Sequence, residues 1–151
     1  MIIQTQQTNK LEKAHFYLIN EFDRFNHYWK FKITSDNIFG NGHANGWMLI
    51  ALENANLGIE YAWSLFTPFL CKSIKGIRTK RFDFNKKYIV HSGDIVQIRF
   101  DGHSHTLYLI TKNGTKKIEN INPGTYRIKI ILIPLVFKKC NVELLSYKMI
   151  Y

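Results

Sequence analysis

The sequence has few cysteines, few acidic residues and no long apolar run, and each shortage excludes a class of protein. Two cysteines, Cys71 and Cys140, are too few for the disulfide framework of a small secreted domain. The longest mostly apolar stretch, residues 128–137, is interrupted by a lysine and a proline and is too short and polar to span a bilayer. The amino terminus shows no apolar core of a secretory signal, so we expect a cytoplasmic protein or one delivered outside by another route.

The shortage of acidic residues makes the chain strongly basic. There are 11 aspartates and glutamates against 21 lysines and arginines, which gives a formal net charge of +10. Basic residues concentrate in segments 72–87 and 112–117, and Phe82, Phe84 and Tyr88 lie in or beside the first of them. This pattern favours an anionic surface as partner, with a cell-wall polymer ranked first and nucleic acid second. A solvated, lysine-rich loop would give the same pattern.

Motifs for metal binding are also sparse. His103 and His105 lie on one face of an expected strand and could meet His43 or His91. No HExxH motif or paired cysteines accompany these histidines. We therefore predict no metal and no cofactor.

The pattern of apolar residues predicts one domain, residues 1–151, with an α+β fold. At 46% hydrophobic and 15% aromatic residues, the chain can bury a full core. Aromatic and aliphatic residues at near-helical spacing predict a helix over 9–29, and apolar segments predict further helices over 44–55 and 59–74. Alternating runs separated by turn signals predict strands from 87 to 151. N-terminal helices packed on a C-terminal antiparallel sheet would be the result.

A loop-to-helix transition is predicted around Ala44. The Gly/Asn-rich segment 37–45 runs directly into the apolar segment 47–57. The first turn of such a helix stabilises anions, so a cysteine there would be a reactive thiolate. Alanine occupies the position and cannot react, and an ordinary capped helix would show the same local pattern.

A histidine and a polar partner are predicted on a neighbouring hairpin. Asn113 and Gly114 between two extended runs are a strong hairpin signal. With those two as turn residues, the register places His105 opposite Asn122, with Asn120 two residues away on the same face. Together with position 44, these residues have the order of a Cys–His–polar triad whose nucleophile is alanine.

In order and spacing, residues 40–122 resemble the NlpC-type cell-wall endopeptidases and related bacterial amidase domains of the papain-like superfamily. The carriers of the resemblance are the segment 43–47, Ser92-Gly93-Asp94 and His105. The resemblance implies a thiol-dependent hydrolase of peptide or amide bonds, with peptidoglycan as the expected substrate, inactive because position 44 is alanine. It implies that position 44 holds the nucleophile and that His105 acts first as the base and then as the acid. Asn120 or Asn122 would orient His105, His43 would assist the oxyanion, and Asn45 and Trp47 would contact the substrate.

Several alternatives to this hypothesis remain open. Ala44 is either an inactivating replacement of cysteine, which we favour, or the native residue of a pseudoenzyme. Cys71 is a rival nucleophile, but its apolar surroundings are typical of a buried, inert cysteine. A non-catalytic basic protein that binds nucleic acid or a protein partner would keep Ala44 as native and use His105 only for packing.

Overall fold

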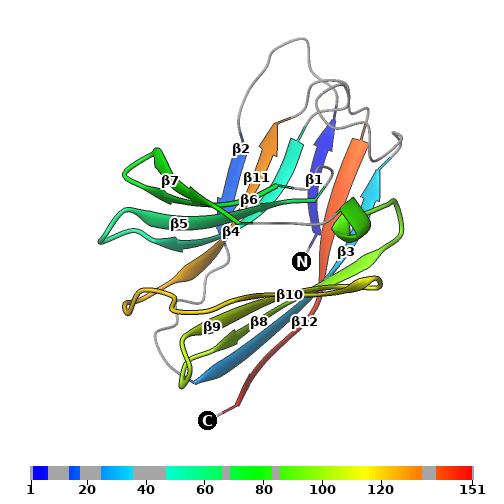
Figure 1. Ribbon diagram of the computed structural model, residues 1–151. Coiled ribbons are helices and arrows are strands. Elements are labelled where there is room, and N and C mark those ends of the chain that lie inside the picture. The colour runs from blue at the N-terminus through cyan, green and yellow to red at the C-terminus, as the bar shows by residue number, and fades with distance from the viewer. Residues whose placement is uncertain are drawn as a thin grey trace.

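The computed structural model describes residues 2–6, 14–17, 25–35, 47–65, 69–82, 86–133 and 139–150. These residues form two six-stranded antiparallel sheets and contain no α-helix (Figure 1). A short 3-10 turn, η2 (Lys86–Tyr88), is present between the seventh and eighth strands. No helix in the described ranges is long and apolar enough to cross a membrane.

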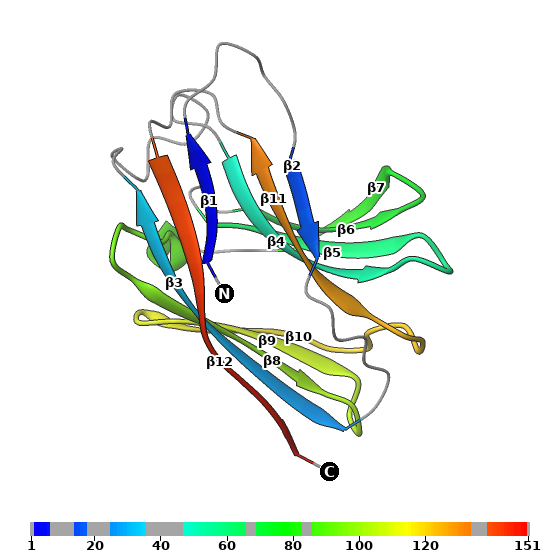
Figure 2. The same ribbon diagram turned by 180° about the vertical axis from the view of Figure 1, so that it is seen from behind.

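Each sheet combines strands from distant parts of the chain. Sheet A has the order β1 (Ile2–Gln6), β12 (Lys139–Ile150), β3 (Asn26–Ser35), β8 (Ile95–Asp101), β9 (Thr106–Thr111) and β10 (Gly114–Ile118). Sheet B has the order β2 (Ala14–Tyr17), β11 (Arg127–Ile133), β4 (Trp47–Asn54), β5 (Ile59–Ser64), β6 (Phe69–Ile74) and β7 (Ile77–Arg81). The rear view shows β12 and β3 running side by side along the length of sheet A (Figure 2).

The core lies between the two sheets. Successive side chains of a strand point to opposite faces, so every second residue of β3 and β8 enters this space. These residues are at most 2% exposed: Trp29, Phe31, Ile33, Val96, Ile98 and Phe100. From sheet B, Trp63 is the largest of the fully buried side chains. Burial of each large apolar side chain contributes roughly 1.5–3 kcal/mol, so this layer is the main stabilising feature.

The predicted α+β, papain-like fold is wrong, because the expected helices are strands. The helix expected over 44–55 is β4 from Trp47 onward, and the helix expected over 59–74 is β5 and β6. In β4, Ile50 and Leu52 face the core between the sheets, while Leu49 and Ala51 are buried on the outer face of sheet B. A strand buried on both faces is apolar at nearly every position, which explains its resemblance to a buried helix.

Apart from Phe25, which lies in a bend, the described residues of the expected helix 9–29 also belong to strands. Ala14–Tyr17 is β2, and β3 begins at Asn26 and continues well beyond the expected end. In β3, buried aromatic and aliphatic residues alternate with Lys30 and Lys32. The period of two, together with β-branched and aromatic residues, favours a strand over a helix.

Among the described residues, the strands expected beyond residue 87 are confirmed, but one register differs from its prediction. Turns separate the strands at Ser92–Gly93 and at Lys112–Asn113. The pairing of β9 with β10 joins Thr111 to Gly114, whereas the prediction paired Lys112 with Thr115. The hairpin is therefore present with its register shifted by two residues.

Candidate binding site

Directly paired residues of five neighbouring strands form a polar row across the outer face of sheet B. We call it the charged row, and its members, from β11 to β7, are Arg127, Glu53, Glu60, Ser73 and Arg78. Paired residues of neighbouring strands project from the same face and lie close together. Glu53 and Glu60 are therefore neighbours, an arrangement of like charges that is unfavourable unless a cation bridges them.

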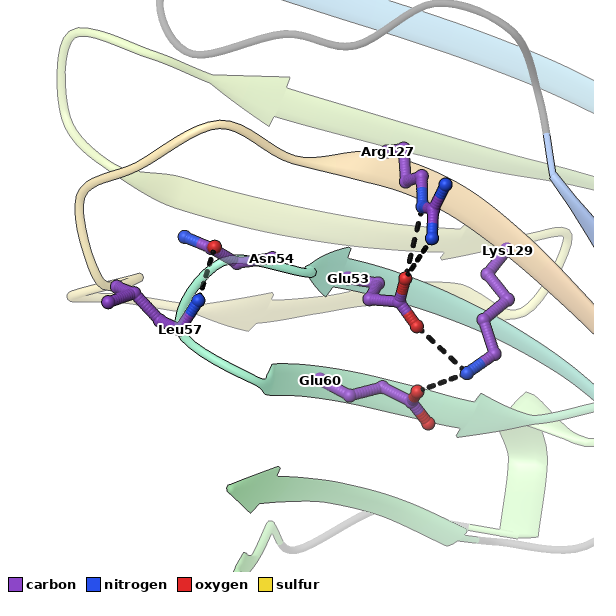
Figure 3. A network of polar contacts seen from close by, with 6 residues as sticks. All are labelled: Glu53, Asn54, Leu57, Glu60, Arg127 and Lys129. Carbon is purple, nitrogen blue, oxygen red and sulfur yellow. Dashed lines mark hydrogen bonds and ion pairs between the residues drawn. The ribbon is translucent and has the colours of Figure 1, made fainter. Parts of the chain in front are cut away.

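Lys129, two residues beyond Arg127 on β11, bridges the two carboxylates. Its Nζ donates to Oε2 of Glu53 at 2.9 Å and to Oε2 of Glu60 at 2.7 Å (Figure 3). Arg127 donates to Oε1 of Glu53 through Nε at 3.0 Å and through a terminal nitrogen at 2.8 Å. Lys129 is only 7% exposed. The four side chains thus hold one another in a fixed, charge-balanced arrangement.

The electrostatics of the network follow from this geometry. Burial of Glu53 opposes its ionisation, but hydrogen bonds from Lys129 and Arg127 outweigh burial and hold the pKa of the carboxyl below its ordinary value. Burial likewise disfavours the charged form of Lys129, and its hydrogen bonds to Glu60 and Glu53 outweigh that cost and raise the pKa of the ammonium. Both groups are therefore charged near neutral pH.

A cavity of about 520 Å³ lies beside this network. Its lining combines charged and hydroxyl groups with aliphatic surface: Glu53, Glu60, Lys129, Ser73, Ile59 and Ile131. Two adjacent turns also line the cavity, one through Gly58 and the other through Lys75 and Gly76. The backbone N–H of Lys75 donates to the carbonyl of Gly58 at 2.8 Å and joins the two turns. Gly58 has φ +67°, and a Cβ at this position would lie 3.1 Å from Cγ of Lys75. Glycine therefore allows the two turns to approach each other.

The remaining part of this outer face carries a buried apolar cluster. Its members are Leu49, Ala51, Ala62, Cys71 and Ile131. Burial raises the pKa of the Cys71 thiol, which leaves it protonated near neutral pH. This buried, apolar environment agrees with the interpretation of Cys71 as a packing residue rather than a nucleophile.

The first group of residues expected in a catalytic site lies around the start of β4. His43, Ala44 and Asn45 lie outside the described residues. Trp47 is the first residue of β4 and pairs with Ile133 of β11. The thiol mechanism requires a helix that begins at position 44, whereas the segment that follows is a strand and lacks the aligned dipoles that would stabilise a thiolate.

The second group lies near the turn between β8 and β9. His105 is in that turn with φ 51°, and its carbonyl accepts the N–H of Ile121 at 2.9 Å. The backbone thus brings His105 near the segment that holds Asn120 and Asn122. Asn120 is exposed, and Oδ1 of Asn122 accepts hydrogen bonds from the Tyr61 hydroxyl at 3.0 Å and from Lys72 Nζ at 2.7 Å. Those hydrogen bonds direct the Asn122 amide oxygen toward sheet B.

The described ranges contain no cluster of side chains that fits the alternative of a metal site. No group of three histidine, cysteine, aspartate or glutamate side chains comes together there in a way that could hold a metal ion. Among the histidines considered from the sequence, His43 lies outside those ranges.

The described residues of the basic segment 72–87 do not form one aromatic-rich surface. Phe82 packs against the core and Tyr88 is 9% exposed, while Phe84 lies outside the described residues. The five residues of β7 are all exposed at the edge of sheet B. Charged residues on an edge strand oppose pairing with other chains, which gives these side chains a structural role of their own.

Comparisons with known proteins establish the fold. No family model and no curated protein sequence matches the chain. Among solved structures, the SPRY domain of human HERC1 matches with a TM-score of 0.68 and 10% identity, over 95% of this chain and 86% of that one. A legume lectin-like domain from Entamoeba histolytica matches with a TM-score of 0.59 and 13% identity, over 99% and 84%. Congerin II, solved with lactose and MES, matches with a TM-score of 0.53 and 15% identity, over 92% and 100%.

These likenesses identify a β-sandwich of the SPRY and lectin type, and they overturn the assignment to the papain-like superfamily. The prediction of a thiol-dependent hydrolase, active or inactivated at Ala44, is wrong for the same reason. Sequence reasoning also missed the charged row. The alternation of Arg127 and Lys129 with isoleucines in β11 was the available signal, but it does not indicate which strands are neighbours.

Proposed function

We propose that the chain is a non-catalytic carbohydrate-binding domain whose ligand occupies the cavity beside the charged row. The observation that carries the proposal is the bridge of Lys129 between Glu53 and Glu60 at the edge of that cavity. Each sugar hydroxyl is both a donor and an acceptor, so neighbouring hydroxyls match a surface where carboxylates and an ammonium stand side by side. The cavity volume lies within the usual range for small-ligand sites, roughly 300–1,000 Å³.

The network leaves hydrogen-bonding capacity for a ligand. Among the described residues, Glu60 uses only Oε2 in the network, and its other oxygen remains available as an acceptor (Figure 3). Of the two isoleucines in the lining, Ile131 belongs to the outer face and supplies aliphatic surface for the apolar face of a sugar ring, whereas Ile59 belongs to the core between the sheets. Lys129 and Arg127 fix Glu53 before a ligand arrives, which reduces the entropy lost on binding. Two of the solved neighbours add support, since one is a lectin-like domain and another was solved with lactose.

The test is a screen of the whole chain against an array of neutral oligosaccharides that includes lactose, followed by calorimetry with the best binder. Glu60→Gln should weaken binding by about tenfold, because a hydrogen bond to a carboxylate is lost. Glu119→Gln is the matched control, since it removes one carboxylate just after β10 of sheet A, away from the cavity, and should leave affinity unchanged. An array without any bound sugar, or a sugar whose affinity ignores Glu60→Gln, would contradict the proposal.

A further inference from the structure

The outer face of sheet A carries a second row, in which cations alternate with aromatic rings. Paired residues of five neighbouring strands, from β12 to β10, form it, and we call it the aromatic row: Lys148, Tyr28, Arg99, Tyr108 and Lys117. The Cζ of Arg99 lies 5.3 Å from the ring centroid of Tyr28 and 5.1 Å from that of Tyr108. The Nζ of Lys148 lies 5.6 Å from the Tyr28 centroid. Rings and cations therefore stand side by side across the sheet.

The positive charge of this row is only partly compensated. Within the described part of the chain, Arg99 and Lys148 form no ion pair, and the Nε of Arg99 has no hydrogen-bond partner. Lys117 differs, because its Nζ lies 2.8 Å from a carboxylate oxygen of Glu119. Asp101 lies two residues after Arg99 on β8. Its Oδ1 accepts hydrogen bonds from the backbone N–H groups of His103 and Ser104. Arg99 and Lys148 thus form no ion pair among the described residues, although the nearby Asp101 carboxylate partly balances the charge of Arg99.

We propose that the aromatic row binds an anionic polysaccharide that runs across the strands of sheet A. Neighbouring strands are about 4.8 Å apart, so cations on every second strand recur at roughly 10 Å. Two sugars of an extended β-linked chain cover about the same distance. A polymer with one carboxylate or sulfate on every second sugar therefore presents its charges in step with Lys148, Arg99 and Lys117. The guanidinium, held between two rings, is positioned in advance for such a group.

The arrangement of the rings argues against nucleic acid as the occupant. Proteins that bind single strands offer open aromatic faces on which bases stack. Here Arg99 and Lys148, from the strands on either side of β3, both lie over the ring of Tyr28, and Arg99 also lies over the ring of Tyr108. The major groove of a duplex admits a helix or a two-stranded ribbon, not the face of a five-stranded row. A sugar chain needs neither an open aromatic face nor an element that enters a groove, because it would lie on the outer face of the sheet and contact the cations and the tyrosine edges there.

The experiment measures binding of the whole chain to hyaluronan, which carries one carboxylate on every second sugar, by calorimetry at low salt. Arg99→Gln and Lys148→Gln should each weaken binding, the first by about tenfold because it removes the central cation. Lys148 is exposed at the end of the row, so its variant keeps the proposal testable if Arg99→Gln folds poorly. Lys80→Gln is the matched control, since it removes one cation that lies over the ring of Phe82 on sheet B, and it should change affinity less than twofold.

Three results would overturn the proposal. Equal losses in the Lys148→Gln and Lys80→Gln variants would mean that net charge alone attracts the polymer. Undiminished binding of carboxyl-reduced hyaluronan would remove the role of the cations. Tighter, Arg99-dependent binding of an oligothymidylate would make nucleic acid the occupant. Because Glu60→Gln alters the cavity of sheet B and not this row, failure of the proposed neutral-sugar site is measured separately.

Discussion

The charged row and the aromatic row cross the two outer faces of the same sandwich, yet they differ in how their charges are balanced. On sheet B, Lys129 and Arg127 neutralise Glu53 and Glu60, and the network is closed except toward the cavity. On sheet A, Arg99 lies between two rings that support it without cancelling its charge. The first arrangement stabilises the fold and presents neutral, directional hydrogen bonding. The second leaves positive charge available to an anionic ligand.

The largest expected effect comes from breaking the closed network. Lys129→Met removes the cation between Glu53 and Glu60 and leaves two partly buried carboxylates facing each other. We expect a loss of about 3 kcal/mol in the free energy of unfolding, measured by urea denaturation. Arg99→Met in the aromatic row removes a charge from an open arrangement and should cost less than about 1 kcal/mol. Similar losses in both variants would show that the two rows do not differ as described.

Acid should remove the contribution of Glu53 in the charged row but not that of Lys148, which forms no ion pair among the described residues of the aromatic row. The folded-state pKa of Glu53 is below its ordinary value of 4.5, so its contribution to stability is present above that pH and is lost as pH falls through the folded pKa. The difference in stability between the wild type and Glu53→Gln should therefore shrink below about pH 4.5. The difference between the wild type and Lys148→Met should stay constant over the same range. A Glu53→Gln difference that does not vary with pH would contradict the ion-pair account.

Salt should separate the two ligands. Raising ionic strength from about 0.05 M to 0.5 M shortens the range of electrostatic attraction, and we expect hyaluronan to bind about tenfold more weakly. Binding of a neutral sugar beside the charged row should change less than about twofold, because no net charge is neutralised on binding. Calorimetry at several salt concentrations provides both values. Parallel losses for the two ligands would indicate one shared, charge-driven site.

The smallest expected effect is a gain of binding. Glu119→Gln releases Lys117 from its carboxylate partner and gives the aromatic row a third cation without an ion pair. Affinity for hyaluronan should rise by about twofold, in line with the modest strength of exposed ion pairs. Glu143→Gln, which removes a carboxylate paired in register with Lys32 on the same face, is a control for the change in net charge. An equal gain from both variants would assign the effect to net charge alone.

Local sequence patterns predicted one half of the fold and misled about the other. The hairpins of β8, β9 and β10 have alternating residues and clear turn signals, so the sequence identifies them. The N-terminal half failed because Ile50 and Leu52 face one apolar layer while Leu49 and Ala51 face another. Such a run has no period that distinguishes a strand from a buried helix. The resemblance to a hydrolase was built on that missing helix.

Neither row could be predicted from the sequence, because each depends on strand neighbours. Tyr28 and Arg99 are far apart in the chain, and only the pairing of β3 with β8 brings them together. Glu53 and Glu60 are close in sequence, but their bridge comes from Lys129 in a strand near the end of the chain. Register decides which residues share a row, and a shift of two residues, such as that found for β9 and β10, would change every contact.

The most direct test of two separate binding faces is a map of amide chemical-shift changes in the isotopically labelled protein. A short hyaluronan oligosaccharide should shift amides around Tyr28, Arg99 and Tyr108 and leave those around Glu53 and Glu60 unchanged. The neutral sugar selected from the array should give the reverse pattern. If both ligands shift the same amides, or if the hyaluronan shifts cluster beside the cavity of sheet B, the account of two faces with opposite treatment of charge is contradicted.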